Sequence, residues 1–218
     1  MSELGKIYAA RFQGTGIEKR QRVWRVLCSE FFSKLIPADA TVLDLACGYG
    51  EFINNIQARE KYAVDLNPDS PGHVDPNVHF FATPANELGF ADDGAMDVVF
   101  TSNFLEHLPD KQACSAVMLE VKRVLRPGGR FMILGPNIRF AHRDYWDYYD
   151  HYLPLSDRSL AEGLSLNGFA VDRVVPRFLP YTMNNNTPTY DVMVKAYLHL
   201  PFAWKLFGKQ FFVVARKP

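Results

Sequence analysis

The segment 42–52 (VLDLACGYGEF) constrains the fold more than any other part of the sequence. It begins with apolar and β-branched residues, passes through a Gly-x-Gly pair at Gly48 and Gly50, and continues into an amphipathic pattern. Because glycine lacks a Cβ, the backbone can turn sharply there and a ligand can lie directly against it. We therefore predict a strand, a tight loop and a helix, which together open a nucleotide-type α/β fold. A strand-to-helix turn without a ligand is the alternative.

The loop departs from the dinucleotide-binding pattern at its third glycine. Ile53 occupies the position at which Gly-x-Gly-x-x-Gly requires that glycine. A helix after this loop packs less closely on its strand than the pattern for NAD requires. An NAD-dependent oxidoreductase is therefore kept only as an alternative function.

A second short strand, within residues 61–68 (KYAVDLNP), ends in an acid at Asp65. In a βαβ unit, an acid at the tip of the second strand lies beside the first loop. Its two oxygens can then accept hydrogen bonds from both hydroxyls of a ribose. A solvent-exposed aspartate that caps the turn before Pro68 is the alternative.

Four segments, taken in order, resemble the class I S-adenosylmethionine-dependent methyltransferases. Residues 44–50 (DLACGYG) resemble the first motif of that family, and Asp65 resembles its ribose-binding acid. Residues 96–108 (MDVVFTSNFLEHL) resemble the fourth strand and the helix after it, and residues 125–131 (LRPGGRF) resemble the turn into the fifth strand. The resemblance implies a Rossmann-like α/β fold. Its seven-stranded, mostly parallel sheet has the order 3-2-1-4-5-7-6, with the last strand antiparallel and helices on both faces.

The resemblance also suggests how the chain is organised. We expect one methyltransferase domain over residues 1–218, because this length and a hydrophobic content of 48% allow a sizeable core. An N-terminal arm and helix would occupy residues 1–36, and the cosubstrate-binding core residues 41–136. The segments 137–155 and 180–208 would form the acceptor side or a lid.

The implied cosubstrate is S-adenosylmethionine, and the implied product is S-adenosylhomocysteine. The resemblance assigns Asp44 to the ammonium group of the cosubstrate and Asp65 to its ribose. Pro84 stands where the family commonly has an acid at the adenine, so Ala85 and Asn86 are the remaining adenine contacts. The other implied cosubstrate contacts are Ala46, Cys47, Gly48, Gly50, Leu66, Ser102 and Asn103.

The sequence after the fourth strand favours an oxygen acceptor. It lacks the Asn/Asp-Pro-Pro-aromatic signature of nucleobase and amide N-methyltransferases, and it lacks the paired-glutamate loop of arginine methyltransferases. His107 follows this strand, and its ordinary pKa suits a base that takes a hydroxyl proton near neutral pH. His151 is a second candidate base. A histidine that only caps or decorates the following helix is the alternative for His107.

A metal site is a further alternative at this position. Asn103, Glu106 and His107 resemble the Glu-x-x-Glu-His arrangement of ubiquinone-biosynthesis and small-RNA 2′-O-methyltransferases, with Asn in place of the first Glu. A neutral Asn weakens the negative charge that Mg²⁺ favours. We therefore predict a reaction without a metal ion.

The segment 140–152 is rich in aromatic residues, with six among thirteen. Aromatic faces beside carboxylates and histidines suit a small or saccharide-like hydroxyl compound, because rings stack on one face and polar groups bond the hydroxyls. We predict that Tyr145, Trp146 and Tyr149 contact such an acceptor. A loop whose aromatic side chains fill the edge of the core is the alternative.

Composition limits the classes of partner that the chain is expected to bind. The formal net charge is +0 and the pI is near 7, so nothing drives the chain towards nucleic acid. The three cysteines are far apart, and no signal pattern or 18-residue apolar run is present, which together predict a cytoplasmic protein. We expect the apolar stretch 190–204 to pack in the core or to form a homodimer contact, and a lid or a peripheral membrane surface is the alternative. A catalytically silent, methyltransferase-like binding protein is the second alternative function.

Overall fold

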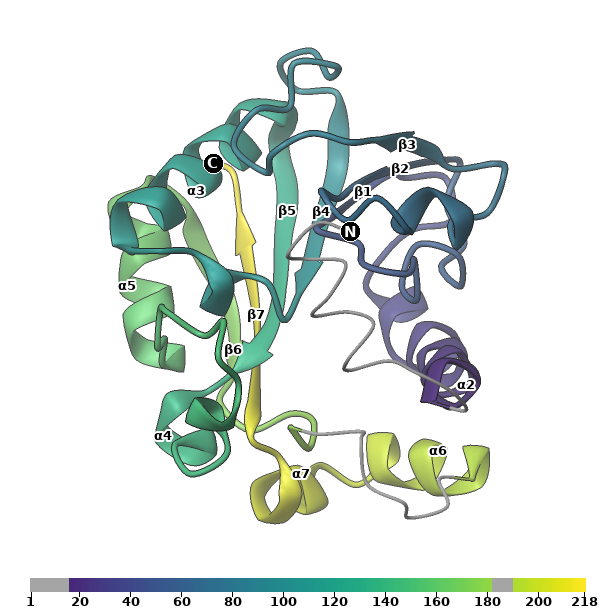
Figure 1. Ribbon diagram of the computed structural model, residues 1–218, viewed down its shortest axis with the longest axis vertical. Coiled ribbons are helices and arrows are strands. Elements are labelled where there is room, and N and C mark those ends of the chain that lie inside the picture. Colours follow the sequence, from purple (N-terminus) through teal and green to yellow (C-terminus); the bar gives the residue numbers. More distant parts are fainter. Residues whose placement is uncertain (1–15, 182–189) are drawn as a thin grey trace. The chain divides into compact units, whose positions relative to one another are not determined.

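A computed structural model describes residues 16–181 and 190–218. Its seven strands form a sheet of order β3-β2-β1-β4-β5-β7-β6, drawn in Figure 1. Strand β7 runs antiparallel to β5 and to β6, whereas β1/β2, β2/β3 and β4/β5 are parallel pairs. The predicted strand order and the antiparallel last strand are therefore confirmed.

The strands and helices have the following bounds. The strands are β1 (Thr41–Leu45), β2 (Glu60–Val64), β3 (His79–Phe81), β4 (Met96–Ser102), β5 (Leu125–Pro136), β6 (Ala170–Val175) and β7 (Gln210–Arg216). The α-helices are α2 (Gly16–Glu30), α3 (Lys111–Val124), α4 (Ile138–Ala141), α5 (Asp157–Leu166), α6 (Asp191–His199) and α7 (Pro201–Phe207). Short 3-10 helices are η1 (Phe32–Lys34), η2 (Ser70–Gly72), η3 (Leu105–His107) and η4 (Tyr145–Asp147).

The chain divides into two compact units. Unit 1 comprises residues 1–84 and 182–201, and unit 2 comprises residues 85–181 and 202–218. Strands β1, β2 and β3 belong to unit 1, and β4, β5, β6 and β7 belong to unit 2.

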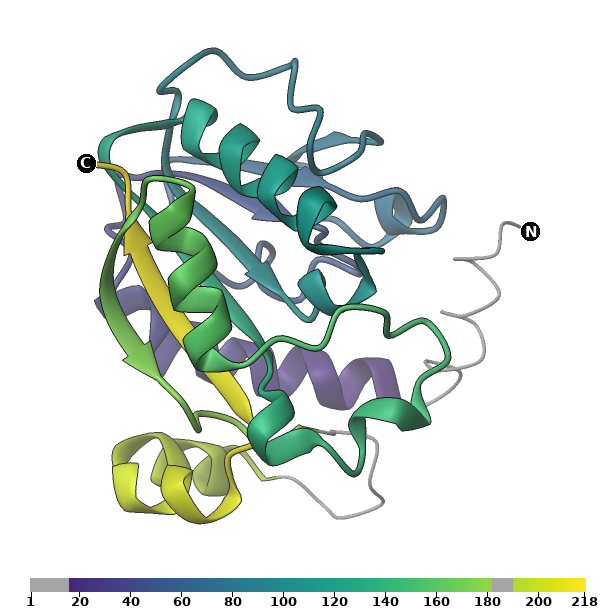
Figure 2. The same ribbon diagram turned by 90° about the vertical axis from the view of Figure 1, so that its left-hand side faces the viewer.

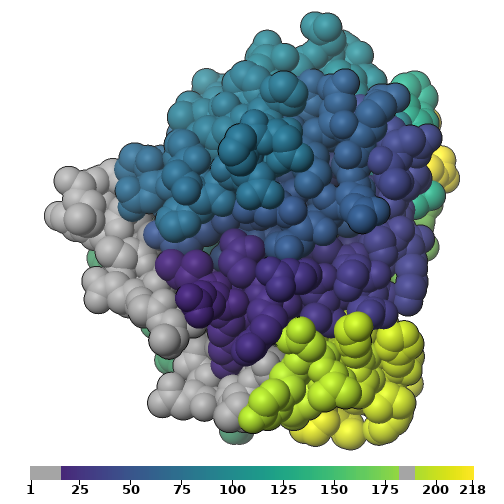
Figure 3. Space-filling model, turned by 90° about the vertical axis from the view of Figure 1, so that its right-hand side faces the viewer, coloured from purple at the N-terminus to yellow at the C-terminus, as the bar shows by residue number. Residues whose placement is uncertain are grey.

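In unit 1, helix α2 packs by its apolar face. Trp24 stacks on Phe32 with ring centroids 6.1 Å apart and meets Phe52 edge-on at 6.3 Å. Helix α6 lies beside α2, where an ion pair of 2.9 Å joins Lys195 to Glu30. Figure 3 shows the two helices side by side, α2 in purple and α6 in yellow-green. The helix predicted within residues 1–36 is therefore present, and the 3-10 helix η1 follows it.

The predicted helix after the Gly-x-Gly loop is wrong, because residues 48–56 form consecutive turns and a bend instead. Nine residues separate Gly50 from the first residue of β2, and only isolated backbone hydrogen bonds of helical spacing form among them, from Asn54 to Gly50 and from Ile56 to Phe52. Asparagine side chains also compete with helical hydrogen bonds. The side-chain amide of Asn55 donates to the carbonyl of Glu51 at 2.8 Å.

In unit 2, helices α3 and α5 lie on the same face of the strands, as Figure 2 shows. The side chain of Asp110 caps α3 by accepting the backbone N–H of Ala113 at 2.8 Å. Ser156 and Ser159 form a reciprocal capping box at the start of α5. Gly168 ends that helix with a φ of 79°, a conformation that favours glycine.

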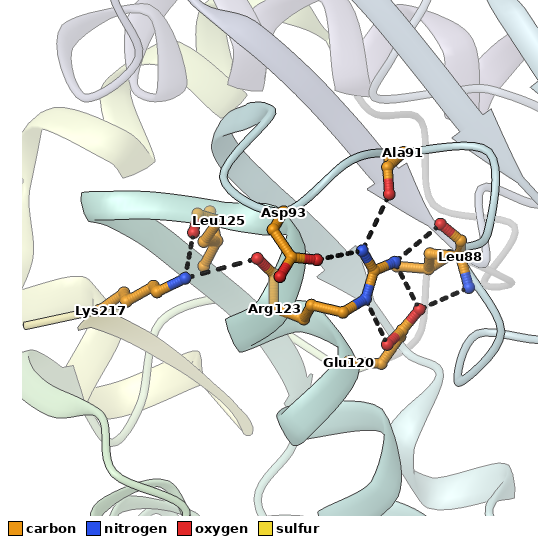
Figure 4. A network of polar contacts seen from close by, with 7 residues as sticks. All are labelled: Leu88, Ala91, Asp93, Glu120, Arg123, Leu125 and Lys217. Atoms are coloured by element: carbon orange, nitrogen blue, oxygen red, sulfur yellow. Dashed lines mark hydrogen bonds and ion pairs between the residues drawn. The ribbon is translucent and has the colours of Figure 1, made fainter.

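A polar network around Arg123 connects α3 to the segment that precedes β4 (Figure 4). The Arg123 guanidinium donates to both carboxylate oxygens of Glu120 at 2.9 Å and to Asp93 at 2.7 Å. It also donates to the carbonyls of Leu88 and Ala91, at 3.0 and 2.9 Å. One side chain thus satisfies two carboxylates and two backbone acceptors within unit 2.

Candidate functional site

The loop after β1 is held in a left-handed backbone conformation at three positions. Ala46, Gly48 and Gly50 have φ angles of 59°, 56° and 70°. A Cβ on Gly50 would lie 3.0 Å from the side chain of Asn54, so space as well as conformation favours glycine there. Ala46 adopts the same region with a side chain, which stores backbone strain of the kind found at ligand-binding turns.

Asp65 fastens this loop to the tip of β2. Its Oδ2 accepts the backbone N–H of Gly48 at 2.7 Å, and its Oδ1 accepts the backbone N–H of Asn67 at 2.8 Å. The residue is only 8% exposed, and burial raises its pKa although these backbone hydrogen bonds act in the opposite direction. A carboxylate offers about four acceptor positions, and the backbone N–H of Leu66 also contributes to the hydrogen bonding of Asp65, so acceptor capacity remains for a ribose hydroxyl.

Asp44 places a second buried carboxylate at the end of β1. It is 2% exposed, and burial raises its pKa well above the ordinary value, with further contributions from the charges of Glu51 and Asp65. Glu51 forms an ion pair of 2.8 Å with Arg20. Because a cation relieves the mutual repulsion of buried carboxylates, this region suits a positively charged ligand. S-adenosylmethionine carries an ammonium and a sulfonium, and the residues present therefore fit it.

The remaining predicted cosubstrate residues have different surroundings. In unit 1, Cys47 is buried with a thiol pKa raised by burial, whereas Leu66 is exposed. In unit 2, Ser102 ends β4, and Asn103 follows it with a φ of 49°. Ala85 and Asn86 also lie in unit 2, in the turn after β3, where Ala85 is half-buried and Asn86 is exposed. The structure thus gathers Asp44, Ala46, Cys47, Gly48, Gly50 and Asp65 around one loop.

The two predicted bases come together in unit 2 although they are far apart in the sequence. The imidazole rings of His107 and His151 have centroids 4.9 Å apart and meet edge-on. The carbonyl of Glu106 accepts the backbone N–H groups of both Tyr152 and Leu153, at 2.8 and 3.0 Å. These hydrogen bonds dock the chain around His151 onto η3. His107 itself ends this short 3-10 helix.

Asp150 orients His107. The Nδ1 of His107 lies 2.9 Å from the carbonyl oxygen of Asp150 and 3.2 Å from its carboxylate Oδ2. Burial alone would lower the pKa of His107, but the hydrogen bonds to Asp150 and the charge of Glu106 outweigh it and raise the pKa. An imidazole paired with a carboxylate in this way is a suitable acceptor for a hydroxyl proton.

The aromatic segment divides into a buried and an exposed part. Tyr145 is fully buried, with its ring 4.6 Å from that of His151, and Tyr148 stacks on the other side of His151 at 4.9 Å. Trp146 and Tyr149 are 60% and 91% exposed. Of the three predicted acceptor contacts, two therefore face solvent and one lines the histidine pair.

Sequence reasoning missed the partners of the two histidines. Asp150 and Tyr148 lie in a run of alternating tyrosines and aspartates, where nothing distinguishes them from their neighbours. Tyr181, whose hydroxyl lies 3.4 Å from Nδ1 of His151, is 30 residues further along the chain. Only the fold brings these side chains together.

A set of metal-ligating side chains is present at the same place. One ligand atom from each of Glu106, His107 and His151 lies within 4.8 Å of the others. The expectation of a reaction without metal rested on Asn103, and it did not consider that His151 joins the other two side chains.

The segment 180–208 lies partly outside the described residues, at 182–189. Its described part includes α6 and α7. Large apolar side chains are exposed on it at Tyr190, Val192, Met193, Leu200, Phe202, Leu206 and Phe207. Lid, dimer contact and membrane surface remain predictions. Over residues 16–181 and 190–218, no helix combines the length and the apolar character that crossing a bilayer demands.

Comparison with known proteins gives a consistent family. A family model described as a methyltransferase domain matches residues 17–174. An uncharacterized methyltransferase of Mycobacterium sp. (strain KMS) is 36% identical over 98 residues, which cover 43% of this chain and 37% of that protein. A counterpart from Mycobacterium marinum is 33% identical over 99 residues, covering 42% of this chain and 37% of that protein. The chain thus spans little more than a third of the length of these relatives.

Two solved structures share the fold. One comes from the complex between the Haloferax volcanii Trm112 methyltransferase activator and a methyltransferase, with a TM-score of 0.72, 17% identity and coverage of 100% of this chain and 99% of that one. The other is an S-adenosylmethionine-dependent methyltransferase from Archaeoglobus fulgidus, with a TM-score of 0.67, 18% identity and coverage of 97% and 99%.

Proposed function

This chain belongs to the methyltransferase domain family, and we propose that it transfers the methyl group of S-adenosylmethionine to a hydroxyl oxygen of a small or saccharide-like acceptor. The product from the cosubstrate is S-adenosylhomocysteine. We assign cosubstrate binding to the loop after β1 in unit 1. We assign activation of the acceptor to the histidine pair of unit 2.

The observation that carries the proposal is the pairing of a left-handed loop with two buried carboxylates. Gly48 donates its backbone N–H to Asp65, and Asp44 lies buried at the start of the same loop. A buried carboxylate without a cation is costly, and one beside an ammonium is stabilised. A ligand with a ribose at one end and an ammonium at the other satisfies both residues.

The chemistry is an in-line displacement. A lone pair of the acceptor oxygen forms the new C–O bond while the C–S bond breaks and its electrons remain on sulfur. The hydroxyl proton passes to a base, for which His107 and His151 are the candidates because they lie together and Asp150 orients His107. Most of the acceleration then comes from positioning and from loss of water.

The exposure of the aromatic side chains indicates which of them contact the acceptor. Trp146 and Tyr149 present their rings to solvent within the segment that also carries His151. Exposed aromatic faces beside polar groups suit a flat or saccharide-like molecule that bears hydroxyls. We assign these two rings to the acceptor, and Tyr145 to the wall behind His151.

Thermal unfolding with S-adenosylmethionine, S-adenosylhomocysteine or NAD tests the first half of the proposal. At a hundredfold excess over Kd, binding stabilises by about 2.7 kcal/mol, a rise in Tm of roughly 5–10 °C for a chain of this size. We expect a shift with the two sulfur ligands only. Asp65→Asn is expected to reduce it, and the exposed Asp39→Asn to leave it unchanged. A shift with NAD alone would indicate an oxidoreductase, and no shift with any ligand a silent binding protein.

Transfer of label from methyl-labelled S-adenosylmethionine to panels of phenols, sugars and amines tests the second half. We expect hydroxyl compounds to be labelled, with KM for the acceptor raised in Trp146→Ala and Tyr149→Ala while the Kd for cosubstrate stays constant. His142→Gln, which changes an exposed residue of the same segment, is the matched control. Labelling of amines alone would show that the oxygen assignment is wrong.

A further inference from the structure

We propose that Glu106, His107 and His151 bind a divalent transition-metal ion, for which Zn²⁺ is the best match. One ligand atom from each side chain already lies within 4.8 Å of the other two. Around a tetrahedral Zn²⁺ with ligands at the usual distances, neighbouring ligand atoms are roughly 3.4 Å apart. Small side-chain rotations therefore close the set around an ion.

The backbone holds the three ligands together. Glu106 and His107 are consecutive in η3, so they move as one piece. The segment with His151 is fastened to them because the Glu106 carbonyl accepts two backbone N–H groups from the residues directly after it. The backbone by itself therefore keeps the three side chains close to one another.

The second nitrogen of each imidazole faces a polar partner. Nδ1 of His107 lies within hydrogen-bond distance of the backbone carbonyl oxygen of Asp150 and of its carboxylate Oδ2, which favours the tautomer with a proton on Nδ1 and a lone pair on Nε2. Nδ1 of His151 lies 3.4 Å from the hydroxyl of Tyr181. Metal-bound histidines characteristically donate their other N–H to a carboxylate, a carbonyl or a similar oxygen. Both imidazoles are thus oriented as ligands rather than as freely rotating bases.

Tyr145 supplies an independent observation. Its side chain is fully buried, and its hydroxyl has no hydrogen-bond partner among the described residues. Its ring lies 4.6 Å from that of His151. A buried hydroxyl without a partner is costly, and an ordered ligand such as a metal-bound water would satisfy it.

The donor set selects the kind of metal. Mg²⁺ favours oxygen ligands in near-ideal octahedral geometry, whereas two imidazoles and one carboxylate are a common catalytic set for Zn²⁺. Three protein ligands leave a coordination position for water or for a hydroxyl group. This ligand set has no place for Asn103, which explains how the site can exist without the first Glu of the pattern Glu-x-x-Glu-His.

The catalytic consequence rests on the proposed function. A hydroxyl oxygen coordinated to the ion would have a lowered pKa and would release its proton to solvent before it attacks the sulfonium methyl group. His107 and His151 would then act as ligands and not as proton acceptors. Metal binding itself does not depend on methyl transfer, and it can be measured alone.

The experiment uses the full chain, stripped with EDTA, dialysed and titrated with Zn²⁺, Co²⁺ or Mg²⁺. We expect one Zn²⁺ per chain, Co²⁺ absorption bands typical of nitrogen and oxygen ligands, and no comparable Mg²⁺ binding. His107→Gln, His151→Gln and Glu106→Gln should each weaken Zn²⁺ binding by a hundredfold or more. Asp150→Asn, which changes a positioning residue, should weaken it by about 10–100-fold. His142→Gln should match the unmodified chain.

Each outcome has a distinct reading. Failure of the unmodified chain to bind one Zn²⁺, or equal binding by all variants, would overturn the site, and binding of Mg²⁺ in preference would overturn the choice of metal. Equal Tm values in EDTA show that a variant still folds. If the chain does not bind Zn²⁺, a rise in Tm on addition of S-adenosylmethionine in EDTA would still support the proposed function. If the chain binds Zn²⁺ but S-adenosylmethionine does not change its Tm, the metal site would be supported and the proposed function contradicted.

Discussion

The carboxylate of Asp65 accepts the backbone N–H of Gly48 at 2.7 Å, so the tip of β2 fixes the conformation of the loop after β1. The same carboxylate is the predicted ribose acceptor. One side chain therefore shapes the loop before a ligand arrives and presents its remaining lone pairs to that ligand. Binding then requires little rearrangement at this position, which reduces the entropic cost of association.

The strain at Ala46 should be measurable. A left-handed φ of 59° costs a residue with a Cβ about 1–2 kcal/mol, more than the 0.4–1 kcal/mol that an added glycine costs through the unfolded chain. We expect Ala46→Gly to raise the free energy of unfolding by about 0.5 kcal/mol. Ala38→Gly, at an exposed position without a positive φ, should lower it. Chemical denaturation of both variants would decide, and destabilisation of equal size in both would exclude strain at Ala46.

Asp44 should make stability depend on pH. Its folded pKa is raised by burial, so its contribution is fully present below the unfolded pKa of about 3.9 and is lost as pH rises through the folded pKa. Asp44→Asn does not ionise, and we expect its Tm relative to the unmodified chain to increase as pH rises from about 4 towards 8. Each 1 kcal/mol corresponds to roughly 2–4 °C. The exposed Asp39→Asn should give a flat difference, and a flat difference for Asp44→Asn as well would contradict the assignment.

Gly208 should tolerate no side chain. A Cβ there would lie 2.6 Å from the Trp204 carbonyl oxygen, 2.7 Å from the carbonyl carbon of Arg177 and 2.9 Å from the nitrogen of Phe178, all of which are backbone atoms. We expect Gly208→Ala to lower the Tm by several degrees or to abolish folding. Gly89→Ala is the control, because its Cβ would meet no atom within 4 Å. Similar melting curves for the two variants would show that the chain between β6 and β7 yields easily.

Arg123 should contribute more to stability than an ordinary surface arginine. Its removal leaves Glu120, Asp93 and the carbonyls of Leu88 and Ala91 without their shared donor. We expect Arg123→Ala to cost about 1–3 kcal/mol in urea denaturation. Arg158→Ala, at an exposed position in α5, should change stability by less than about 0.5 kcal/mol. Equal losses in the free energy of unfolding of the two variants would show that water replaces the hydrogen bonds of the Arg123 network in Figure 4 without a cost in stability.

Local chemistry explains what the sequence predicted well. The apolar run that opens residues 42–52 and the Gly-x-Gly pair after it encode a strand and a tight loop through neighbouring residues, and both lie where the pattern predicts them. The strand order was accessible only through the resemblance of ordered motifs to a family. The missing helix after Gly50 is a failure of the opposite kind, because an asparagine side chain that bonds the backbone competes with a local amphipathic pattern.

The surroundings of His107 and His151 cannot be predicted from the sequence, for a physical reason. His107 and His151 were identified as chemically capable side chains, but their proximity depends on backbone hydrogen bonds across the fold. The sequence pattern relates Glu106, as a metal ligand, only to Asn103 and His107. The third ligand and the orienting Asp150 come from a segment more than 40 residues away. Spacing along a chain does not encode such a meeting.

The chain between β5 and α5 is fixed by backbone hydrogen bonds at both of its ends. Ile138 donates its backbone N–H to the carbonyl of Leu155, and Tyr152 donates its own to Glu106. The exposed rings of Trp146 and Tyr149 lie between these two positions, whereas Tyr145 and Tyr148 contact His151. Evolution, or an engineer, can therefore replace the two exposed side chains to recruit new acceptors while the contacts of His151 are left in place.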